Sequence, residues 1–371
     1  MRRIPVSLGA RSYEIMIGHE IIAKLGEALR ELELGSKQMI VTSRTVWALW
    51  GKIVHDSLEA SGFDVSVTLV NDDEEAKSLQ TLTTIFDELL ENEFERSSGI
   101  VAVGGGVVGD AAGFAAATYM RGIRFVQVPT TLLAQVDSSI GGKTGVNHPK
   151  AKNLIGAFHQ PRLVWTDVST LSTIPERELR SGLAEIIKYS IIADPELFRL
   201  LTENVHSFSS ISREILIEII CRCCSIKARI VEEDEKDQGV RSILNYGHTI
   251  GHALESLTGY AHYTHGEAIA IGMMAAALIS LEIDATDHDM VQSQESIIKR
   301  AGLPTTVLQP IDPVEIVRQL NKDKKRLGEQ VRWVLPRRVG EVFLTEDVPS
   351  DVVLKVLHNM TGSPEVKVGC S

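Results

Sequence analysis

The feature that most constrains the fold is an alternation of short β-rich runs with helical patterns over residues 1–170. Residues 78–94 place apolar side chains three or four positions apart, which predicts an amphipathic helix. Five apolar runs around it are predicted to be strands: residues 38–42, 65–70, 100–103, 124–128 and 163–166. Because strands that alternate with helices favour βαβ units, we predict a Rossmann-like α/β domain with a mostly parallel sheet.

Beyond about residue 170 the strand signals fade and helical periodicity dominates. Five segments are predicted to be helices: residues 177–192, 212–234, 245–257, 266–281 and 289–301. Only residues 330–335 and 342–344 look extended. Ser, Thr and Pro cluster at residues 171–175, which indicates a boundary. We therefore predict an α/β domain over residues 1–172 and a mainly helical domain over residues 173–371, with an interface of the kind that favours clefts.

Charge and cysteine content narrow the classes of partner and compartment. The 371 residues carry 38 Lys plus Arg against 49 Asp plus Glu, a net charge of −11, which argues against nucleic acid or an anionic membrane as partner. Four cysteines form no disulfide framework, so we expect a reducing compartment. The first seven residues lack the apolar core of a secretion signal, and the apolar run 268–281 is too short for a membrane span. We expect a soluble cytoplasmic protein.

A glycine-rich turn directly follows the predicted strand at 100–103. Gly104, Gly106 and Gly109 fit the pattern G-x-G-x-x-G, and a helix is predicted to follow over residues 110–119. Such a turn lets the backbone approach a pyrophosphate at a helix N-terminus. The turn follows roughly the third strand instead of the first, and no acidic residue lies about 20 positions on. The pattern alone therefore supports dinucleotide binding and a tightly packed βα turn about equally.

A second glycine loop, residues 137–144, ends in Gly-Gly-Lys-Thr. It lacks the earlier glycine of an ATP-binding P-loop, because Ser138 stands at that position. A lysine beside two glycines still suits a phosphate or a carboxylate, and the alternative is a solvated loop lysine. Further cations lie in or beside apolar helical patterns of the second domain: Lys188, Lys227, Arg241, Lys324 and Lys325.

Four of the eleven histidines, His248, His252, His262 and His265, lie within 18 residues. His248 and His252 are four apart, on one face of a predicted helix. Glu185 lies on another, otherwise apolar helix face. A carboxylate and two imidazoles would leave open positions on a divalent ion, as catalytic metal sites require. The glutamate of a zinc-protease H-E-x-x-H motif is missing. A metal site is favoured over structural histidines, and either His248 or His252 could be the ligand.

Four strings together resemble the 3-dehydroquinate synthase family: residues 104–117, 121–143, 182–188 and 244–252. The resemblance extends over about residues 40–340. It implies an NAD-binding α/β domain, a helical metal-binding domain and a cleft between them. It also implies the shikimate-pathway conversion of 3-deoxy-D-arabino-heptulosonate 7-phosphate to 3-dehydroquinate and phosphate, with NAD, one divalent zinc or cobalt ion, and a homodimer. Asp73 and Ala151 stand where this family commonly has glycine.

The same resemblance implies roles for individual residues. The metal ligands would be Glu185, His248 and His265. The NAD site would comprise Asp72, Glu74, Lys77, Gly106, Val107, Val108, Gly109, Asp110, Thr130, Thr131, Lys143, Lys152, Thr170, Leu171, Ser172 and Thr173. Substrate would contact Lys143, Lys152, Asn153, Lys188, Lys227, Arg241, Asn245, His252, Lys325 and, from the neighbouring subunit, Arg121. The catalytic set would be Asp137, Lys188, Asn245 and His252.

The family's chemistry accounts for this mixture of parts. NAD takes a hydride from a ring hydroxyl held by the metal, phosphate leaves by elimination, and the hydride then returns, so no net redox occurs. Ring opening and an intramolecular aldol reaction complete the sequence. Two enzymatic alternatives are another sugar-phosphate cyclase and a metal- and NAD-dependent polyol dehydrogenase; a third is a non-enzymatic metal-binding oligomer. A cyclase whose substrate lacks a carboxylate would leave Lys227, Arg241 and Asn245 unmatched, and the dehydrogenase would accumulate NADH.

Overall fold

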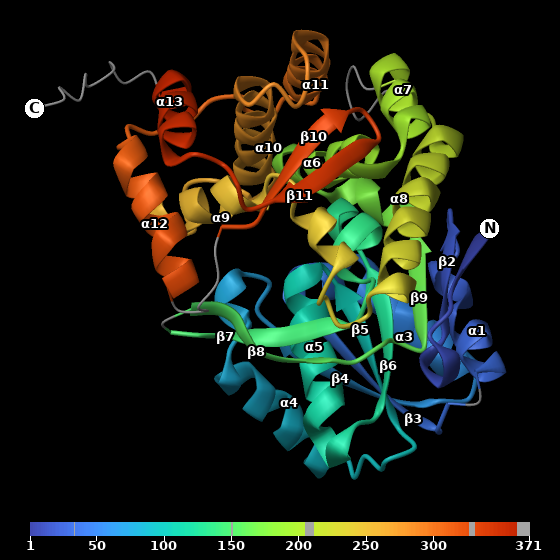
Figure 1. Cartoon of the computed structure of the whole chain (residues 1–371). Coiled ribbons are helices and arrows are strands. Elements are labelled where there is room, and N and C mark those ends of the chain that lie inside the picture. Colours follow the sequence, from blue (N-terminus) through green and yellow to red (C-terminus); the bar gives the residue numbers. More distant parts are fainter. Residues whose placement is uncertain (33, 150, 205–210, 326–330, 362–371) are drawn as a thin grey trace, which may run out of the picture. The chain divides into compact units, whose positions relative to one another are not determined.

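The structure is a computed structural model that describes residues 1–32, 34–149, 151–204, 211–325 and 331–361 (Figure 1). Side chains of residues 321–325 are not among those described. The chain forms two compact units. Unit 1 comprises Met1–Pro175 and Ser212–Asp237, and unit 2 comprises Glu176–Ile211 and Gln238–Ser371.

A seven-stranded sheet organises unit 1, with strand order β1-β2-β9-β6-β5-β3-β4. Only the pair β1 and β2 is antiparallel; the other neighbours are parallel. The strands are β1 (Arg2–Val6), β2 (Tyr13–Gly18), β3 (Lys37–Ser43), β4 (Asp64–Val70), β5 (Gly99–Gly104), β6 (Arg124–Pro129) and β9 (Leu163–Asp167). The five predicted strands are confirmed as β3, β4, β5, β6 and β9, while β1 and β2 were not predicted.

Both faces of this sheet are covered by helices, as a parallel sheet requires. Along β5 the side chains alternate: Ile100 and Ala102 enter one core cluster, Val101 and Val103 the other. Helices α4 (Leu79–Glu91) and α5 (Gly106–Thr118) supply the first cluster, and α1 (Leu25–Glu31) and α3 (Lys52–Ala60) supply the second. The predicted helices at 78–94 and 110–119 are thus confirmed as α4 and α5. The short helix α2 (Arg44–Val46) follows β3.

The chain order creates a switch point beside the glycine turn. From β3 the chain adds β4 on one side, then returns to place β5, β6 and β9 on the other. At such a reversal the loops after two neighbouring parallel strands diverge and leave a crevice, where nucleotides bind in open α/β sheets. The turn at Gly104–Gly106 follows β5 at this point. A separate hairpin, β7 (Lys143–His148) and β8 (Ala151–Phe158), carries the second glycine loop's lysine.

Helix α8 (Arg213–Glu233) corrects the predicted division at residues 172 and 173. The first segment of unit 1 ends near that boundary, at Pro175, but Ser212–Asp237 also belongs to unit 1. There α8 packs against β1 and β2. The apolar periodicity of residues 212–234 correctly predicted a helix, but periodicity does not specify which core receives the apolar face.

Unit 2 is mainly helical. Its helices are α6 (Glu176–Ala193), α7 (Pro195–Asn204), α9 (His248–Leu257), α10 (His265–Glu282), α11 (His288–Arg300), α12 (Pro313–Lys325) and α13 (Ser350–Thr361). A hairpin of β10 (Trp333–Arg338) and β11 (Glu341–Thr345) completes it. Predicted helices are confirmed as α6, α9, α10 and α11, and the extended segments as the hairpin; the predicted start of β10 at Gln330 lies outside the described residues.

Helix α10 is the core of unit 2. It packs against α6, α9, α11, α13 and β10, and most of its residues are buried. Among the described residues it alone is long and apolar enough by composition to cross a membrane, and 72% of it is buried inside the structure. A helix that is apolar all round is expected at the centre of a packed unit. This helix confirms the interpretation of residues 268–281 as a buried segment.

The crossing of α9 and α10 yields a stability prediction. An added Cβ at Gly272 would overlap the carbonyl oxygen of Gly247, which precedes α9. Alanine has a helix propensity better than glycine by about 1 kcal/mol, but backbone overlap cannot be relieved by a rotamer change. We expect Gly272→Ala to lower the free energy of unfolding by a net ~1–3 kcal/mol, measured by urea denaturation.

Gly259→Ala provides the control. Its φ is 63° and no heavy atom lies within 4 Å of the added Cβ, so only left-handed backbone strain of about 1 kcal/mol is expected. A Gly272→Ala protein at least as stable as the parent would show that the two helices can separate without loss.

Candidate active site

The glycine turn presents uncapped amides at the start of α5. Gly105 occupies the N-cap position and provides no side-chain cap. An added Cβ at Gly106 would lie 3.0 Å from Ser138 Oγ, and one at Gly109 would lie 2.8 Å from Gln127 Oε1. Gly109 therefore serves close helix–sheet packing, while the open N-terminus of α5 suits an anionic group. Both readings of the glycine pattern have a basis in the structure.

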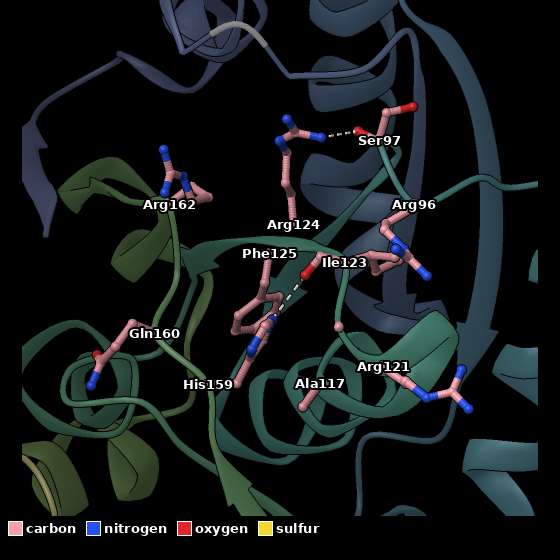
Figure 2. Close-up of a pocket in the computed structure, with 11 residues that line it drawn as sticks. Arg96, Ser97, Ala117, Arg121, Ile123, Arg124, Phe125, His159, Gln160 and Arg162 are labelled. Atoms are coloured by element: carbon pink, nitrogen blue, oxygen red, sulfur yellow. Dashed lines mark hydrogen bonds between the residues drawn. The ribbon is translucent and has the colours of Figure 1, made fainter. Parts of the chain in front are cut away.

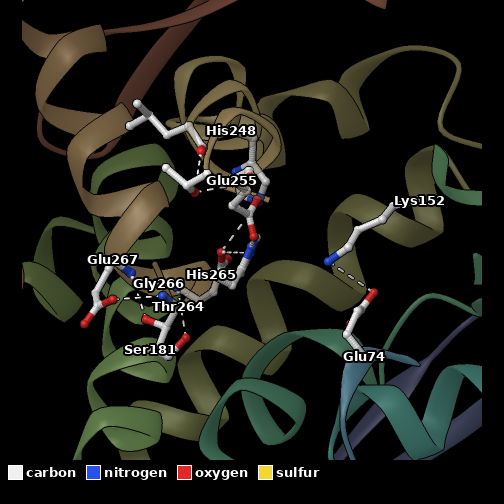
Figure 3. Close-up of polar contacts among 12 residues, drawn as sticks. Glu74, Lys152, Ser181, His248, Glu255, Thr264, His265, Gly266 and Glu267 are labelled. Atoms are coloured by element: carbon white, nitrogen blue, oxygen red, sulfur yellow. Dashed lines mark hydrogen bonds and ion pairs between the residues drawn. The ribbon is translucent and has the colours of Figure 1, made fainter. Parts of the chain in front are cut away.

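A buried lysine connects this turn to two neighbouring segments of unit 1. Lys77, 6% exposed, places Nζ 2.7 Å from Asp110 Oδ2 and donates to Asn153 Oδ1 at 2.6 Å. Burial raises the pKa of Asp110, although the ammonium of Lys77 opposes that shift. Lys152 Nζ lies 3.4 Å from Glu74 Oε1 (Figure 3). The structure therefore brings together five of the predicted nucleotide or substrate residues in one charged network.

The ends of β6 and β9 place the threonines predicted to contact the nucleotide. Thr130 and Thr131 follow β6 directly, and residues 170–173 lie in the short helix η7 (Val168–Thr173) after β9. Gln135, fully buried, donates hydrogen bonds from Nε2 toward Pro129 O, Asp167 O and Thr170 Oγ1, at 3.0–3.2 Å. This amide therefore couples the two segments. Asp72 is exposed in the loop after β4.

Asp167 holds the base of this region together. Its fully buried carboxylate accepts hydrogen bonds from the backbone N–H groups of Glu20, Ile21 and Ile22, and from the N–H and hydroxyl of Ser169. Several donors per carboxylate compensate the loss of hydration. The start of η7 is thereby attached to the segment that follows β2.

Two predicted substrate lysines belong to unit 1 and pair with carboxylates there. Lys227, on α8, is 6% exposed and donates to Asp137 Oδ1 and to the Asp137 carbonyl oxygen, both at 2.8 Å. Lys143, at the start of β7, forms an ion pair with Asp237. The assignment of Lys227 to the helical domain is wrong, because α8 packs in unit 1.

Arg121 borders a cationic hollow on unit 1. The cavity, about 590 Å³, is also lined by Arg96, Arg124, Arg162 and His159, and none of its described lining residues is acidic. The four guanidinium groups surround the hollow without converging on one point (Figure 2). Arg121 is exposed at a left-handed φ of 66°, an uncommon conformation for a residue with a side chain. Sequence reasoning singled out Arg121 but missed the other arginines: Arg124 is three residues away, whereas Arg96 and Arg162 come from distant segments.

The candidate metal centre lies in unit 2, where three helices meet. Glu185 is fully buried on α6. His248 and His265 are the first residues of α9 and α10 (Figure 3). Glu185 Oε1 lies 3.6 Å from His248 Nε2 and 3.4 Å from His265 Nε2. One ligand atom from each residue lies within 4.8 Å of the others. A carboxylate oxygen and two imidazole nitrogens at this spacing fit a divalent ion such as zinc or cobalt, with open positions remaining.

The pKa shifts of the two imidazoles reflect this setting. Burial lowers the pKa of His248 well below its ordinary value, and Glu185 only partly opposes the shift. For His265 burial acts in the same direction, but hydrogen bonds to Glu185 and Glu255 prevail and raise its pKa to about 10. The two carboxylates thus create a negative potential at His265, and the same potential favours a dication.

The remaining predicted residues of unit 2 lie on α6, α9 and the short helix η9 (Val240–Asn245). Lys188 is 1% exposed and forms an ion pair with Glu185. Arg241 is 2% exposed, whereas Asn245 is exposed. His252 is exposed, and its ring centroid lies 5.1 Å from that of His248. The predicted role of Lys325 falls outside the described side chains.

The sequence analysis missed one carboxylate at the candidate metal centre, that of Glu255. Glu255 on α9 belongs to a second group of close ligand atoms with His252 and His265. It lies seven residues after His248 and three after His252, on the same helix face. That spacing is a usable signal, but it carries weight only once His265 is known to lie opposite.

Comparisons with known proteins give the family. Two family profiles match the chain: 3-dehydroquinate synthase N-terminal over residues 67–181, and 3-dehydroquinate synthase C-terminal over residues 182–326. The chain belongs to the 3-dehydroquinate synthase family. A 3-dehydroquinate synthase from Nostoc punctiforme is 48% identical over 359 residues, covering 96% of this chain and 99% of the relative. One from Desulforamulus reducens is 46% identical over 357 residues, covering 96% and 99%.

Solved structures of related cyclases share the fold. A 2-epi-5-epi-valiolone synthase from Streptomyces hygroscopicus, with NAD⁺ and Zn²⁺ bound, superposes with a TM-score of 0.88 at 26% identity, covering 96% of this chain and 99% of that one. A 2-deoxy-scyllo-inosose synthase complexed with carbaglucose-6-phosphate, NAD⁺ and Co²⁺ gives 0.87 at 28% identity, covering 97% and 100%. A probable glycerol dehydrogenase from Sinorhizobium meliloti, at 16% identity and a TM-score of 0.65, shares the fold alone.

Proposed function

We propose that this protein is a 3-dehydroquinate synthase, which converts 3-deoxy-D-arabino-heptulosonate 7-phosphate to 3-dehydroquinate and inorganic phosphate in the shikimate pathway. The observation that carries the proposal is the identity of 46–48% to proteins of that name over nearly the full length of both chains. The other cyclases of known structure are only 26–28% identical. A polyol dehydrogenase has support from the fold alone.

The donor set fits the metal that this activity implies. Glu185, His248 and His265 would hold one zinc or cobalt ion, and both imidazoles turn Nε2 toward the same carboxylate oxygen. The N-terminus of α5 and the network around Lys77 and Asp110 fit NAD. When bound, NAD supplies a transient hydride acceptor and the ion a Lewis acid for the substrate's hydroxyl.

The chain's own side chains then bind substrate and move protons. A substrate with a phosphate and a carboxylate requires several fixed cations. Arg241, Asn245 and Lys227 are proposed to bind the carboxylate. Lys143, Lys152, Asn153 and Lys325 are proposed to bind the rest of the substrate with its phosphate. His252 and Lys188, beside the metal centre, are proposed to hold or move protons at the reacting oxygens, with Asp137 and Asn245 completing the catalytic set.

The ion pairs of the described structure are consistent with these roles. Lys227 and Lys143 are paired with Asp137 and Asp237. A dianionic phosphate or a carboxylate offers such ammonium groups a comparable charge-assisted partner. The substrate would therefore exchange partners at these lysines instead of binding cations that are otherwise bare.

A direct assay tests the proposed activity. Because the borrowed hydride is returned, we expect phosphate release from the heptulosonate phosphate with only trace NAD, in the presence of zinc, and no accumulating NADH. The measurement combines a phosphate assay with absorbance of the reduced nicotinamide. Stoichiometric NADH growth without phosphate release would instead identify a polyol dehydrogenase.

A homodimer is proposed because Arg121 would reach the neighbouring subunit's substrate. The exposed Arg121 and the arginines around its hollow support an interface with a negatively charged partner, and this chain carries a net charge of −11. Light scattering of the active protein is expected to give about twice 40.7 kDa. Full activity of a protein that stays monomeric throughout the assay range would contradict the dimer.

A cytoplasmic location is also proposed: Cys221, Cys223 and Cys224 are free thiols, as a reducing compartment would keep them. Fractionation of source cells, with immunodetection of the protein, checks it, and recovery outside the cytoplasm would contradict it.

The metal set predicts different consequences for the two histidines of α9. His248→Ala is expected to remove nearly all bound metal, because a site with three protein ligands loses one of them. His252→Ala is expected to retain the metal and lose activity, because His252 is proposed to act on protons. Metal analysis of both purified variants is the measurement, and full metal retention by His248→Ala would refute the ligand assignment.

Arg241 offers a test of the carboxylate pocket. Arg241→Lys preserves the charge but replaces a planar fork by a point charge. We expect kcat/KM to fall roughly 30- to 1000-fold, equivalent to ~2–4 kcal/mol of lost transition-state binding. Metal content and melting temperature are expected to stay near parental values. A kcat/KM within about threefold of the parent, which is a change in activation free energy below ~1 kcal/mol, would refute the carboxylate role. A lowered melting temperature would indicate that Arg241 forms a purely structural ion pair.

A further inference from the structure

Glu255 faces the ring of a proposed metal ligand from the side opposite Glu185. Its carboxylate Oε1 lies 3.4 Å from His265 Nδ1 (Figure 3). On the other side of the ring, His265 Nε2 lies 3.4 Å from Glu185 Oε1. The Glu255 side chain is only 12% exposed. Two carboxylates therefore contact the two nitrogens of one imidazole.

The backbone of His265 is fixed independently of this contact. Thr264 and Glu267 form a capping box at the start of α10, and Gly266 N donates to Ser181 Oγ at 2.9 Å. Gly266 also lies against the backbone of Ser181, where a Cβ would overlap it. These contacts set where α10 begins. They leave the rotation of the His265 ring, and the choice of protonated nitrogen, to be decided by side-chain partners.

His248 shows the same arrangement with a different acceptor. Its Nδ1 lies 3.1 Å from the carbonyl oxygen of Tyr246, and its Nε2 faces Glu185. In each ring an acceptor therefore engages Nδ1, so that Nε2, once it carries no proton, can offer its lone pair to an ion held beside the Glu185 oxygen. A backbone carbonyl and a carboxylate are the two acceptors that usually orient metal-binding histidines.

We propose that Glu255 is a positioning residue of the metal centre, which accepts the Nδ1 proton of His265 and so directs Nε2 to the ion. This inference rests on the proposed metal site and names a residue to which no role has been assigned. The carboxylate fixes the tautomer, holds the ring plane and increases the donor strength of Nε2. Removal of such partners typically lowers metal affinity 10- to 100-fold.

The test measures affinity for Co²⁺ alone, by competition with a chelator, together with the visible absorption of the bound ion. We expect Glu255→Ala to bind Co²⁺ about 10- to 100-fold more weakly, with an altered spectrum. Glu255→Gln keeps an oxygen acceptor but loses the charge, so its affinity is expected to lie between those of Ala and the parent. Glu282→Ala, which removes an ion pair with Lys355 at the far end of α10, is the matched control and is expected to bind as the parent does.

The outcomes separate this inference from the proposed metal site. Glu185→Gln is expected to abolish tight binding; if it does not, or if the parent binds no Co²⁺, the metal site itself is wrong. Glu255→Ala affinity within about threefold of the parent overturns the positioning role. Loss of binding in Glu255→Ala with retention in Glu185→Gln would make Glu255 a direct ligand with His252 and His265, and also overturns it. If Glu255→Ala does not fold, Glu255→Gln decides, and affinity within twofold of the parent counts against the role.

A double-mutant comparison tests whether Glu255 affects Co²⁺ affinity through His265. His265→Ala is itself expected to leave only weak Co²⁺ binding, which is titrated directly by visible absorption without a chelator. Adding Glu255→Gln is expected to change that residual affinity by less than about twofold, because the partner ring is absent. An undiminished loss in that background would show that Glu255 acts through the local potential instead of through His265, and would overturn the proposal.

Discussion

The organisation of unit 2 depends on burying one carboxylate. Glu185 is completely shielded from solvent on α6, and an isolated charge in that position would be strongly unfavourable. Three groups from three segments therefore converge on it: the ammonium of Lys188 one turn along, and the imidazoles at the starts of α9 and α10. The apolar helix α10 and the close approach of Gly272 to Gly247 bring those helix starts together. The carboxylate and the two imidazoles together offer the ligand atoms of a divalent ion, which would add to the charge compensation that Lys188 provides.

Unit 1 uses the same principle to shape a different surface. Asp167 is also fully buried, but it is compensated by backbone amides and a hydroxyl instead of by cations. Its neighbour Gln135 connects the ends of β6 and β9. The loops after the parallel strands are thus held in place near the switch point, where the N-terminus of α5 and the Lys77–Asp110 pair also lie. Buried polar groups, not loop sequence alone, position the candidate nucleotide residues.

Local sequence patterns were sufficient to predict most of the secondary-structure elements. The strands at 38–42, 65–70, 100–103, 124–128 and 163–166 follow from short apolar runs, because most strands of this sheet are buried on both faces. The long helices follow from the 3.6-residue period. β1 and β8 lack a clear pattern because most of their residues are exposed or only partly buried, whereas β2, which alternates in burial, and β7, which buries Thr144–Val146, were missed despite their burial. In the site, helical spacing grouped His248 with His252 but could not choose between them. The family resemblance, not the spacing, suggested the choice.

By itself the sequence determined which elements form, where the nucleotide-type turn lies, and, by resemblance, the family and its chemistry. Such properties are encoded in residues near one another along the chain, or in strings specific enough to match whole. The tertiary structure alone decided that α8, with Lys227, packs against β1 and β2, and that Arg96 and Arg162 join Arg121 and Arg124 around one hollow. It also decided that the carboxylate of Glu255 lies beside Nδ1 of His265. These pairings join residues separated by a loop, a domain segment or most of the chain, and they depend on which apolar faces pack together. A local periodicity shows that a face is apolar but does not specify which element packs against it, because many elements could cover the same face equally well.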